Sequence, residues 1–131
     1  MRVLLIEDDS ATAKSVELML KSESFNVYVT SLGEEGVDLG KIYDYDIILL
    51  DLNLPRKDGR EALKEIKSHP DLRKIPVIVL TTSKADEDIC KSYRLGVNSY
   101  ITKPVTFASL VEVMKALGKY WFEIVELPSH D

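Results

Sequence analysis

The stretch Ile47-Ile-Leu-Leu-Asp-Leu-Asn-Leu-Pro55 is the most informative part of this sequence. Its four leading apolar residues are typical of a buried strand. Asp51 follows directly, at the end of the strand where open α/β sheets bind their ligands. Two other apolar runs also end in charged residues: Glu7-Asp8-Asp9 follows the first, and Lys103-Pro104 follows the last. Together these strand ends predict a charged pocket with room for a divalent cation and a phosphoryl group.

Short apolar runs alternate with amphipathic stretches along the whole chain. Such alternation predicts strand–helix units and a doubly wound parallel sheet with helices on both faces, an α/β fold. The expected strands are Arg2–Ile6, Asn26–Thr30, Ile47–Leu50, Pro76–Leu80 and Tyr100–Ile101. The expected helices are Ser10–Ser22, Leu32–Ile42, Arg60–Lys67, Asp86–Leu95 and Phe107–Tyr120.

The first expected helix carries a pattern that divides a core face from an outer face. Ser10 is expected to be its N-cap. The core face is expected to consist of Thr12, Val16, Met19 and Leu20, which share one side at helical spacing. Lys14 and Leu18 then point outward, beside the acidic pocket. An exposed leucine there predicts a partner contact, although singly exposed leucines are also common on protein surfaces.

Length and composition are those of one ordinary domain. The chain has 131 residues, of which 45% are hydrophobic, and its net charge is −5. We expect one domain over residues 1–131, no membrane segment and no signal peptide, because no apolar run approaches about 20 residues. The one cysteine fits the reducing bacterial cytoplasm. No basic stripe is present, so direct DNA binding is not expected.

Taken singly, each acid has an ordinary explanation, such as a loop aspartate or a helix cap. Taken jointly, they meet in one crevice, because a parallel sheet brings the ends of its strands to one edge. Several close carboxylates repel one another unless a cation joins them. Mg²⁺ suits such a site because it takes one or two carboxylates together with phosphate oxygens. Asp51 is then a nucleophile for an acyl phosphate, with Thr81 and Lys103 as contacts for phosphoryl oxygens.

The order and spacing of these motifs resemble those of the receiver domains of bacterial two-component response regulators. The resemblance covers nearly the whole chain. It rests on Glu7-Asp8-Asp9, Asp51-Leu-Asn-Leu-Pro55 with Gly59, Thr81, Tyr100 and Lys103-Pro104. It implies a flavodoxin-like (βα)5 sheet of strand order 2-1-3-4-5.

The resemblance also implies roles for the acidic residues. Asp51 is the expected phosphoacceptor, which takes its phosphoryl group from the phosphohistidine of a histidine kinase or a histidine phosphotransfer protein. Asp8 is the expected main ligand of Mg²⁺, Glu7 acts through water, and the backbone carbonyl of Asn53 completes the coordination.

Further roles concern the response to phosphorylation. Lys103 is expected to contact the phosphoryl group, and Thr81 and Tyr100 to form a switch that reshapes the face made by the fourth helix, fifth strand and fifth helix. That face is a candidate homodimer contact. The candidate partner surface consists of Leu18, Lys14, Ile89 and Tyr93. One departure is Thr82, since many receivers have alanine or glycine after the switch threonine.

The two parts of the chain resemble different receivers. About the first 55 residues resemble receivers of alphaproteobacterial cell-cycle regulators of the CtrA type. The remainder resembles single-domain regulators that serve phytochrome-type kinases. This change in resemblance predicts an engineered chimera with a fusion point near residues 47–56 and a short tail over residues 121–131. A fusion at that point would preserve the pocket. A natural divergent receiver is the alternative.

Three other functions compete with a signalling module that is not an enzyme in the usual sense. An aspartyl phosphatase would need a second acid where the chain has Asn53. A flavodoxin-like cofactor binder would need a phosphate-binding loop where the chain has Glu7-Asp8-Asp9. A chimeric scaffold without a signalling role would keep the pocket residues only because its parents had them.

Overall fold

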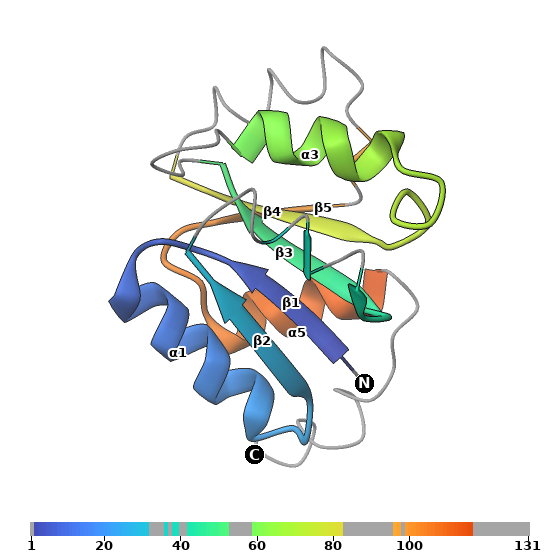
Figure 1. Ribbon diagram of the computed structural model, residues 1–131. Coiled ribbons are helices and arrows are strands. Elements are labelled where there is room, and N and C mark those ends of the chain that lie inside the picture. The colour runs from blue at the N-terminus through green and yellow to red at the C-terminus, as the bar shows by residue number, and fades with distance from the viewer. Residues whose placement is uncertain are drawn as a thin grey trace.

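The computed structural model describes residues 2–31, 36, 38–39, 42–52, 59–82, 96–97 and 99–116. Its centre is a five-stranded parallel sheet of order β2-β1-β3-β4-β5 (Figure 1). The strands are β1 (Arg2–Ile6), β2 (Asn26–Thr30), β3 (Ile47–Asp51), β4 (Val77–Thr81) and β5 (Ser99–Thr102). The helices are α1 (Ser10–Lys21), α3 (Gly59–Ser68) and α5 (Phe107–Ala116). The predicted flavodoxin-like α/β fold and its strand order are confirmed.

The central strands are apolar because helices cover both faces of the sheet. Every residue of β3 and β4 is buried, as expected for parallel strands covered on both sides. Alternate side chains enter two separate cores. Val3 and Leu5 of β1 pack with α1 and α5, whereas Leu4 and Ile6 pack with α3. Figure 1 shows α3 on the opposite side of the sheet from α1 and α5.

The start of α1 differs from the prediction. Asp9, not Ser10, is the N-cap, because its extended backbone lets its carboxylate accept a hydrogen bond from the Thr12 N–H at 3.0 Å. Thr12 is consequently half-buried near the cap, and Ala13 takes the buried place beside Val16 and Leu20. Leu18 is 56% exposed, so its predicted outward position is confirmed.

The bounds of three strands also differ from the prediction, by one residue at each end that changes: β3 ends at Asp51, β4 runs over Val77–Thr81, and β5 runs over Ser99–Thr102. β4 begins at Val77 instead of Pro76, and proline lacks the N–H that a ladder requires. The Pro76 carbonyl still accepts from the Ile48 N–H at 3.0 Å. β3 includes Asp51, which pairs with Leu80, so the key acid belongs to the strand itself.

Several predictions lie outside the described residues. The helix expected over Asp86–Leu95 is one of them, together with its partner-surface candidates Ile89 and Tyr93. Of the helix expected over Leu32–Ile42, isolated positions are described, and Gly36 is helical. Asn53, the last four residues of the expected helix Phe107–Tyr120, and the tail over residues 121–131 also lie outside. None of the described helices has the length and apolar character that a membrane span requires.

Candidate functional site

The charged residues meet at the carboxyl edge of the sheet. Glu7 follows β1, Asp51 ends β3, Thr81 ends β4 and Lys103 follows β5. The hydrogen-bond pattern of the sheet continues into this edge: the Glu7 N–H donates to the Thr30 carbonyl at 2.9 Å, and the Lys103 N–H donates to the Thr81 carbonyl at 2.8 Å. The backbone therefore fixes where these side chains start.

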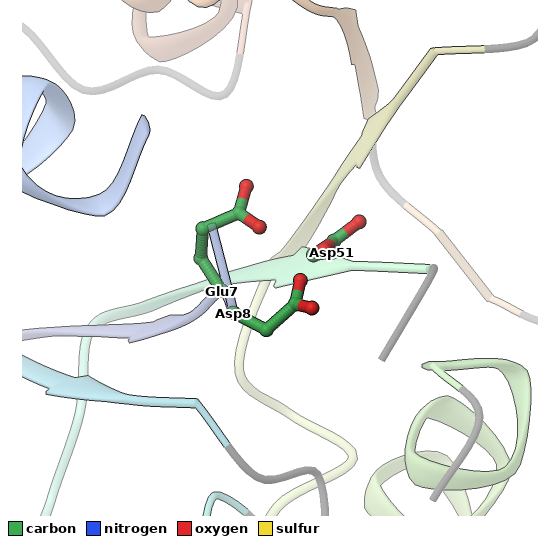
Figure 2. Close-up of side chains that lie close together, drawn as sticks. All are labelled: Glu7, Asp8 and Asp51. Carbon is green, nitrogen blue, oxygen red and sulfur yellow. The ribbon is translucent and has the colours of Figure 1, made fainter. Parts of the chain in front are cut away.

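Three carboxylates converge at this edge. Glu7, Asp8 and Asp51 each offer an oxygen within 4.8 Å of the others, and Figure 2 shows the three side chains gathered where β1 and β3 end. Glu7 and Asp51 are each only 1% exposed, whereas Asp8 is exposed. Desolvation raises the pKa of Asp8 above its ordinary 3.8, and Asp51 raises it further through a hydrogen bond and charge repulsion. The carboxylates therefore repel one another in the absence of a cation.

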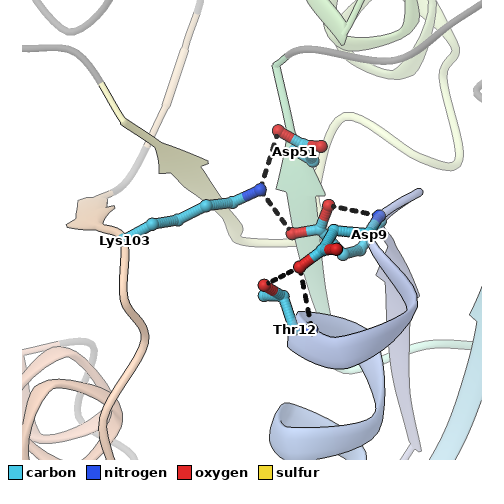
Figure 3. A network of polar contacts seen from close by, with 5 residues as sticks. Asp9, Thr12, Asp51 and Lys103 are labelled. Atoms are coloured by element: carbon cyan, nitrogen blue, oxygen red, sulfur yellow. Dashed lines mark hydrogen bonds and ion pairs between the residues drawn. The ribbon is translucent and has the colours of Figure 1, made fainter.

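Lys103 reaches this acidic cluster from the neighbouring strand. Its Nζ lies 2.6 Å from Glu7 Oε1 and 3.4 Å from Asp51 Oδ1, and Figure 3 shows the lysine side chain reaching toward Asp51. Burial alone would lower the pKa of Lys103, but the hydrogen bond to Glu7 and the charges of Asp51 and Glu7 raise it overall. The ammonium group is thus held in its charged form. The Lys103–Pro104 peptide bond is cis.

The cluster has the charge and chemistry that a magnesium ion requires. Three carboxylates against one ammonium group leave a formal excess of two negative charges among these four side chains. Carboxylate oxygens are the ligands that Mg²⁺ prefers, and it needs only one or two of them from the protein. Asp8 and Asp51 fit this role best, because Lys103 lies closer to Glu7, at 2.6 Å, than to Asp51, at 3.4 Å.

Of the predicted switch residues, Thr81 ends β4 at the edge that carries the cluster, and Tyr100 lies within β5, where it pairs with Val79. Thr81 is fully buried at the end of β4. Tyr100 is half-buried in β5 and packs against the core on the α3 side of the sheet. Thr82, the departure noted in the sequence, is exposed. The geometry brings Thr81 to the same edge as Asp51 and Lys103, and the roles of Thr81 and Tyr100 in switching remain predictions.

The contact between Asp9 and Thr12 is not among the predictions from the sequence. The motifs place Asp9 in the acidic cluster, and the helical spacing places Thr12 in the core. In the structure, the Thr12 backbone N–H and hydroxyl both donate to Asp9 Oδ2, at 3.0 Å and 2.5 Å (Figure 3). The spacing of an aspartate three residues before a threonine at a helix start could have indicated this cap.

Comparison with known proteins agrees with this site. The family model of the response regulator receiver domain matches residues 3–115. The cell cycle response regulator CtrA of Brucella ovis is 54% identical over 117 residues, which cover 89% of this chain and 50% of that protein. The chain thus spans about half the length of the curated relatives that it matches. The likeness to CtrA extends past residues 47–56, and a chimeric origin stays a prediction.

Solved structures give the same result. The bacteriophytochrome response regulator AtBRR superposes with a TM-score of 0.83 at 34% identity, covering 92% of this chain and 94% of that one. The receiver domain of the sensor histidine kinase PA1611 from Pseudomonas aeruginosa, with a magnesium ion coordinated in its active site cleft, has a TM-score of 0.80 at 31% identity, covering 89% of this chain and 97% of that one. The chain therefore belongs to the receiver domain family of response regulators, the phosphoacceptor modules of two-component signalling.

Proposed function

We propose that Asp51 is the phosphoacceptor of this receiver and takes a phosphoryl group from the phosphohistidine of a histidine kinase or a histidine phosphotransfer protein. The observation that carries this proposal is the placement of Asp51. Its carboxylate is 1% exposed, ends a central strand and lies 3.4 Å from Lys103 Nζ. Burying a carboxylate beside two others costs stability, so a function is the better explanation for it.

The transfer itself needs few groups. An Asp51 carboxylate oxygen attacks the phosphorus, and the new O–P bond forms as the N–P bond to the donor imidazole breaks. The bonding electron pair stays on the imidazole nitrogen. Lys103 stabilises the charge on the transferring oxygens from a position that it already occupies, and the Thr81 hydroxyl would donate a hydrogen bond to another oxygen.

Mg²⁺ would be held by Asp8, Asp51 and the backbone carbonyl of Asn53, with Glu7 acting through water. When bound, the ion supplies positive charge that offsets the carboxylates and the incoming phosphoryl group. The engagement of Glu7 Oε1 by Lys103 supports an indirect role for Glu7. The convergence of the three carboxylates supports the site as a whole.

Partner recognition is assigned to surfaces beside the site. Leu18 is 56% exposed on α1, and Lys14 is exposed one turn earlier on the same helix. We assign this surface to the phosphohistidine donor. We assign the output surface to β5 and α5 together with the helix expected over Asp86–Leu95, where rearrangement of Thr81 and Tyr100 would favour a homodimer. Sedimentation velocity before and after phosphorylation tests the dimer, since an unchanged monomer would contradict it.

The experiment that tests the phosphoacceptor is incubation with acetyl phosphate and Mg²⁺, followed by intact mass spectrometry. We expect a gain of one phosphoryl mass that requires Mg²⁺ and disappears in Asp51→Asn. Circular dichroism of both proteins controls for folding. A folded chain that gains no mass under any of these conditions would favour the scaffold without a signalling role.

A further inference from the structure

A chain of polar contacts connects the first turn of α1 with Lys103. Asp9 Oδ2 accepts hydrogen bonds from both the backbone N–H and the hydroxyl of Thr12. The Asp9 N–H in turn donates to Glu7 Oε2 at 3.3 Å. The other oxygen of Glu7, Oε1, binds Lys103 Nζ at 2.6 Å. Figure 3 follows these contacts from Thr12 to Lys103 and Asp51.

In this arrangement, Asp9 and Glu7 have different contacts. Thr12 holds the Asp9 carboxylate at the helix cap, so Asp9 is not among the three carboxylates that converge. Glu7 Oε2 accepts a hydrogen bond from the Asp9 N–H, and Oε1 forms an ion pair with Lys103, so the Glu7 carboxylate lies between Asp9 and Lys103. The Glu7 side chain is fully buried, so the direction in which it presents Oε1 determines where the Lys103 ammonium group can lie.

We propose that Thr12 is a positioning residue for phosphoryl transfer, because its hydroxyl holds Asp9 and Glu7 in the arrangement that aims Lys103 at Asp51. The inference rests on the proposed function of Asp51. Without the hydroxyl, the Asp9 carboxylate keeps one hydrogen bond, from the Thr12 backbone N–H. It can then turn toward the cluster and compete with Glu7 for Lys103. Groups that orient a site through its direct contacts are commonly needed for full activity.

The test compares matched variants of the whole chain. Thr12→Val removes the hydroxyl and keeps the shape, Thr12→Ala is a second hydroxyl-free variant, and Thr12→Ser restores the hydroxyl. Ser22→Ala is the control, since it removes a hydroxyl hydrogen bond, to the Met19 carbonyl, at the other end of the same helix. The readout is the rate constant for phosphorylation by acetyl phosphate at saturating Mg²⁺, alongside the Mg²⁺ dissociation constant from calorimetry.

We expect Thr12→Val and Thr12→Ala to lower the rate constant by about fivefold to tenfold, the lower end of effects for such orienting groups, because one hydrogen bond to Asp9 remains. Thr12→Ser should stay within about twofold of the wild type, as should Ser22→Ala, and the Mg²⁺ dissociation constant should not change. Equal rates in Thr12→Val and Ser22→Ala would overturn the proposal.

A double-mutant cycle and a spectroscopic measurement separate positioning from general stability. In a Lys103→Met background, Thr12→Val should have no further effect on the rate, since it acts through the lysine. Hydrogen exchange of the Lys103 ammonium group, followed by NMR, should be faster in Thr12→Val than in Ser22→Ala. Unchanged exchange would contradict the proposal. If the wild type accepts no phosphoryl group, the proposed function fails, and the exchange measurement still decides whether Thr12 positions Lys103.

Discussion

The contacts of polar groups differ between the carboxyl edge of the sheet, where the strands end, and the amino edge, where they begin. At the carboxyl edge, three carboxylates face one ammonium group, and two of the acids are almost fully buried. At the amino edge, the charged groups contact backbone groups or aromatic rings. The Arg2 N–H donates to Asp46 Oδ2 at 2.9 Å, and the Arg2 guanidinium lies 5.9 Å from the centroid of the Tyr43 ring.

Lys67 follows the same pattern, whereas Tyr45 of the amino edge makes ring contacts. Lys67 Nζ donates to the Arg73 and Ile75 carbonyls in the loop before β4, at 3.4 Å and 3.2 Å. Burial lowers the pKa of this lysine below 10.5. The ring of Tyr45 packs edge-on against Tyr28 and Tyr43, with centroids 5.6 Å and 6.3 Å away.

The two edges differ in how their polar groups affect the stability of the fold. The contacts of charged groups with backbone groups and rings at the amino edge stabilise the fold, whereas the excess of negative charge at the carboxyl edge opposes it. Strained or unbalanced groups are retained where function needs them, while the rest of the fold supplies the stability. Four predictions, which use five substitutions, test this difference, from the largest expected effect to the smallest.

Lys103→Met should have the largest effect on stability. It leaves the buried Glu7 carboxylate without its cation, and breaking such a buried pair costs about 3 kcal/mol. Asp46→Ala at the amino edge removes an exposed hydrogen bond and should cost about 1 kcal/mol or less. Urea denaturation of both variants measures the difference. Equal losses would mean that the two edges do not differ as described.

Asp8→Asn should weaken Mg²⁺ binding by about tenfold or more, because ligand charge sets the affinity of such sites. It should also change the pH dependence of stability. The raised pKa of Asp8 means that the folded state binds this proton more tightly than the unfolded state. Its contribution to stability therefore falls as pH rises from 3.8 through the raised pKa, and is constant above it.

The measurement for Asp8→Asn is the free energy of unfolding from about pH 4 to about pH 7, with and without Mg²⁺. Without Mg²⁺, the free energy of unfolding of the variant should increasingly exceed that of the wild type as the pH rises toward neutral. Mg²⁺ should reduce this excess. A variant that is less stable than the wild type at neutral pH without Mg²⁺ would show that the cluster is not repulsive.

Gly96→Ala should destabilise the amino edge by about 1 kcal/mol, since a side chain in a left-handed backbone conformation costs this much. Gly96 has φ of 77°, and an added Cβ would lie 3.3 Å from Cδ of Lys67. Thermal unfolding measures the loss, and phosphorylation should keep its normal rate because the site is at the other edge. A slower phosphorylation rate would show that the two edges are coupled.

Tyr45→Phe should have the smallest effect. Tyr45 is 6% exposed, and within the described part of the chain its hydroxyl has no hydrogen-bond partner. Removing that hydroxyl leaves the ring contacts in place, so stability should stay within about 0.5 kcal/mol of the wild type or rise slightly. A clear loss in calorimetry would reveal a polar contact of this hydroxyl that the amino edge depends on.

Much of this architecture could be predicted from the sequence. The apolar runs located all five strands to within one residue at each end, because strands covered on both faces must be apolar throughout. The motif order indicated the strand order and the convergence of Glu7, Asp8, Asp51 and Lys103. The helix cap was misplaced by one residue, since Asp9 and Ser10 are both good caps and only the backbone conformation chooses between them.

By itself, the sequence determined the family, the parallel sheet and the set of charged residues at its carboxyl edge. The tertiary structure decided how those residues share their contacts. Lys103 lies closer to Glu7 than to Asp51, and Asp9 turns away to cap α1. The physical reason is that residue spacing fixes which strand end carries a charge, whereas the pairing of buried charges depends on differences of less than 1 Å between side chains from separate elements.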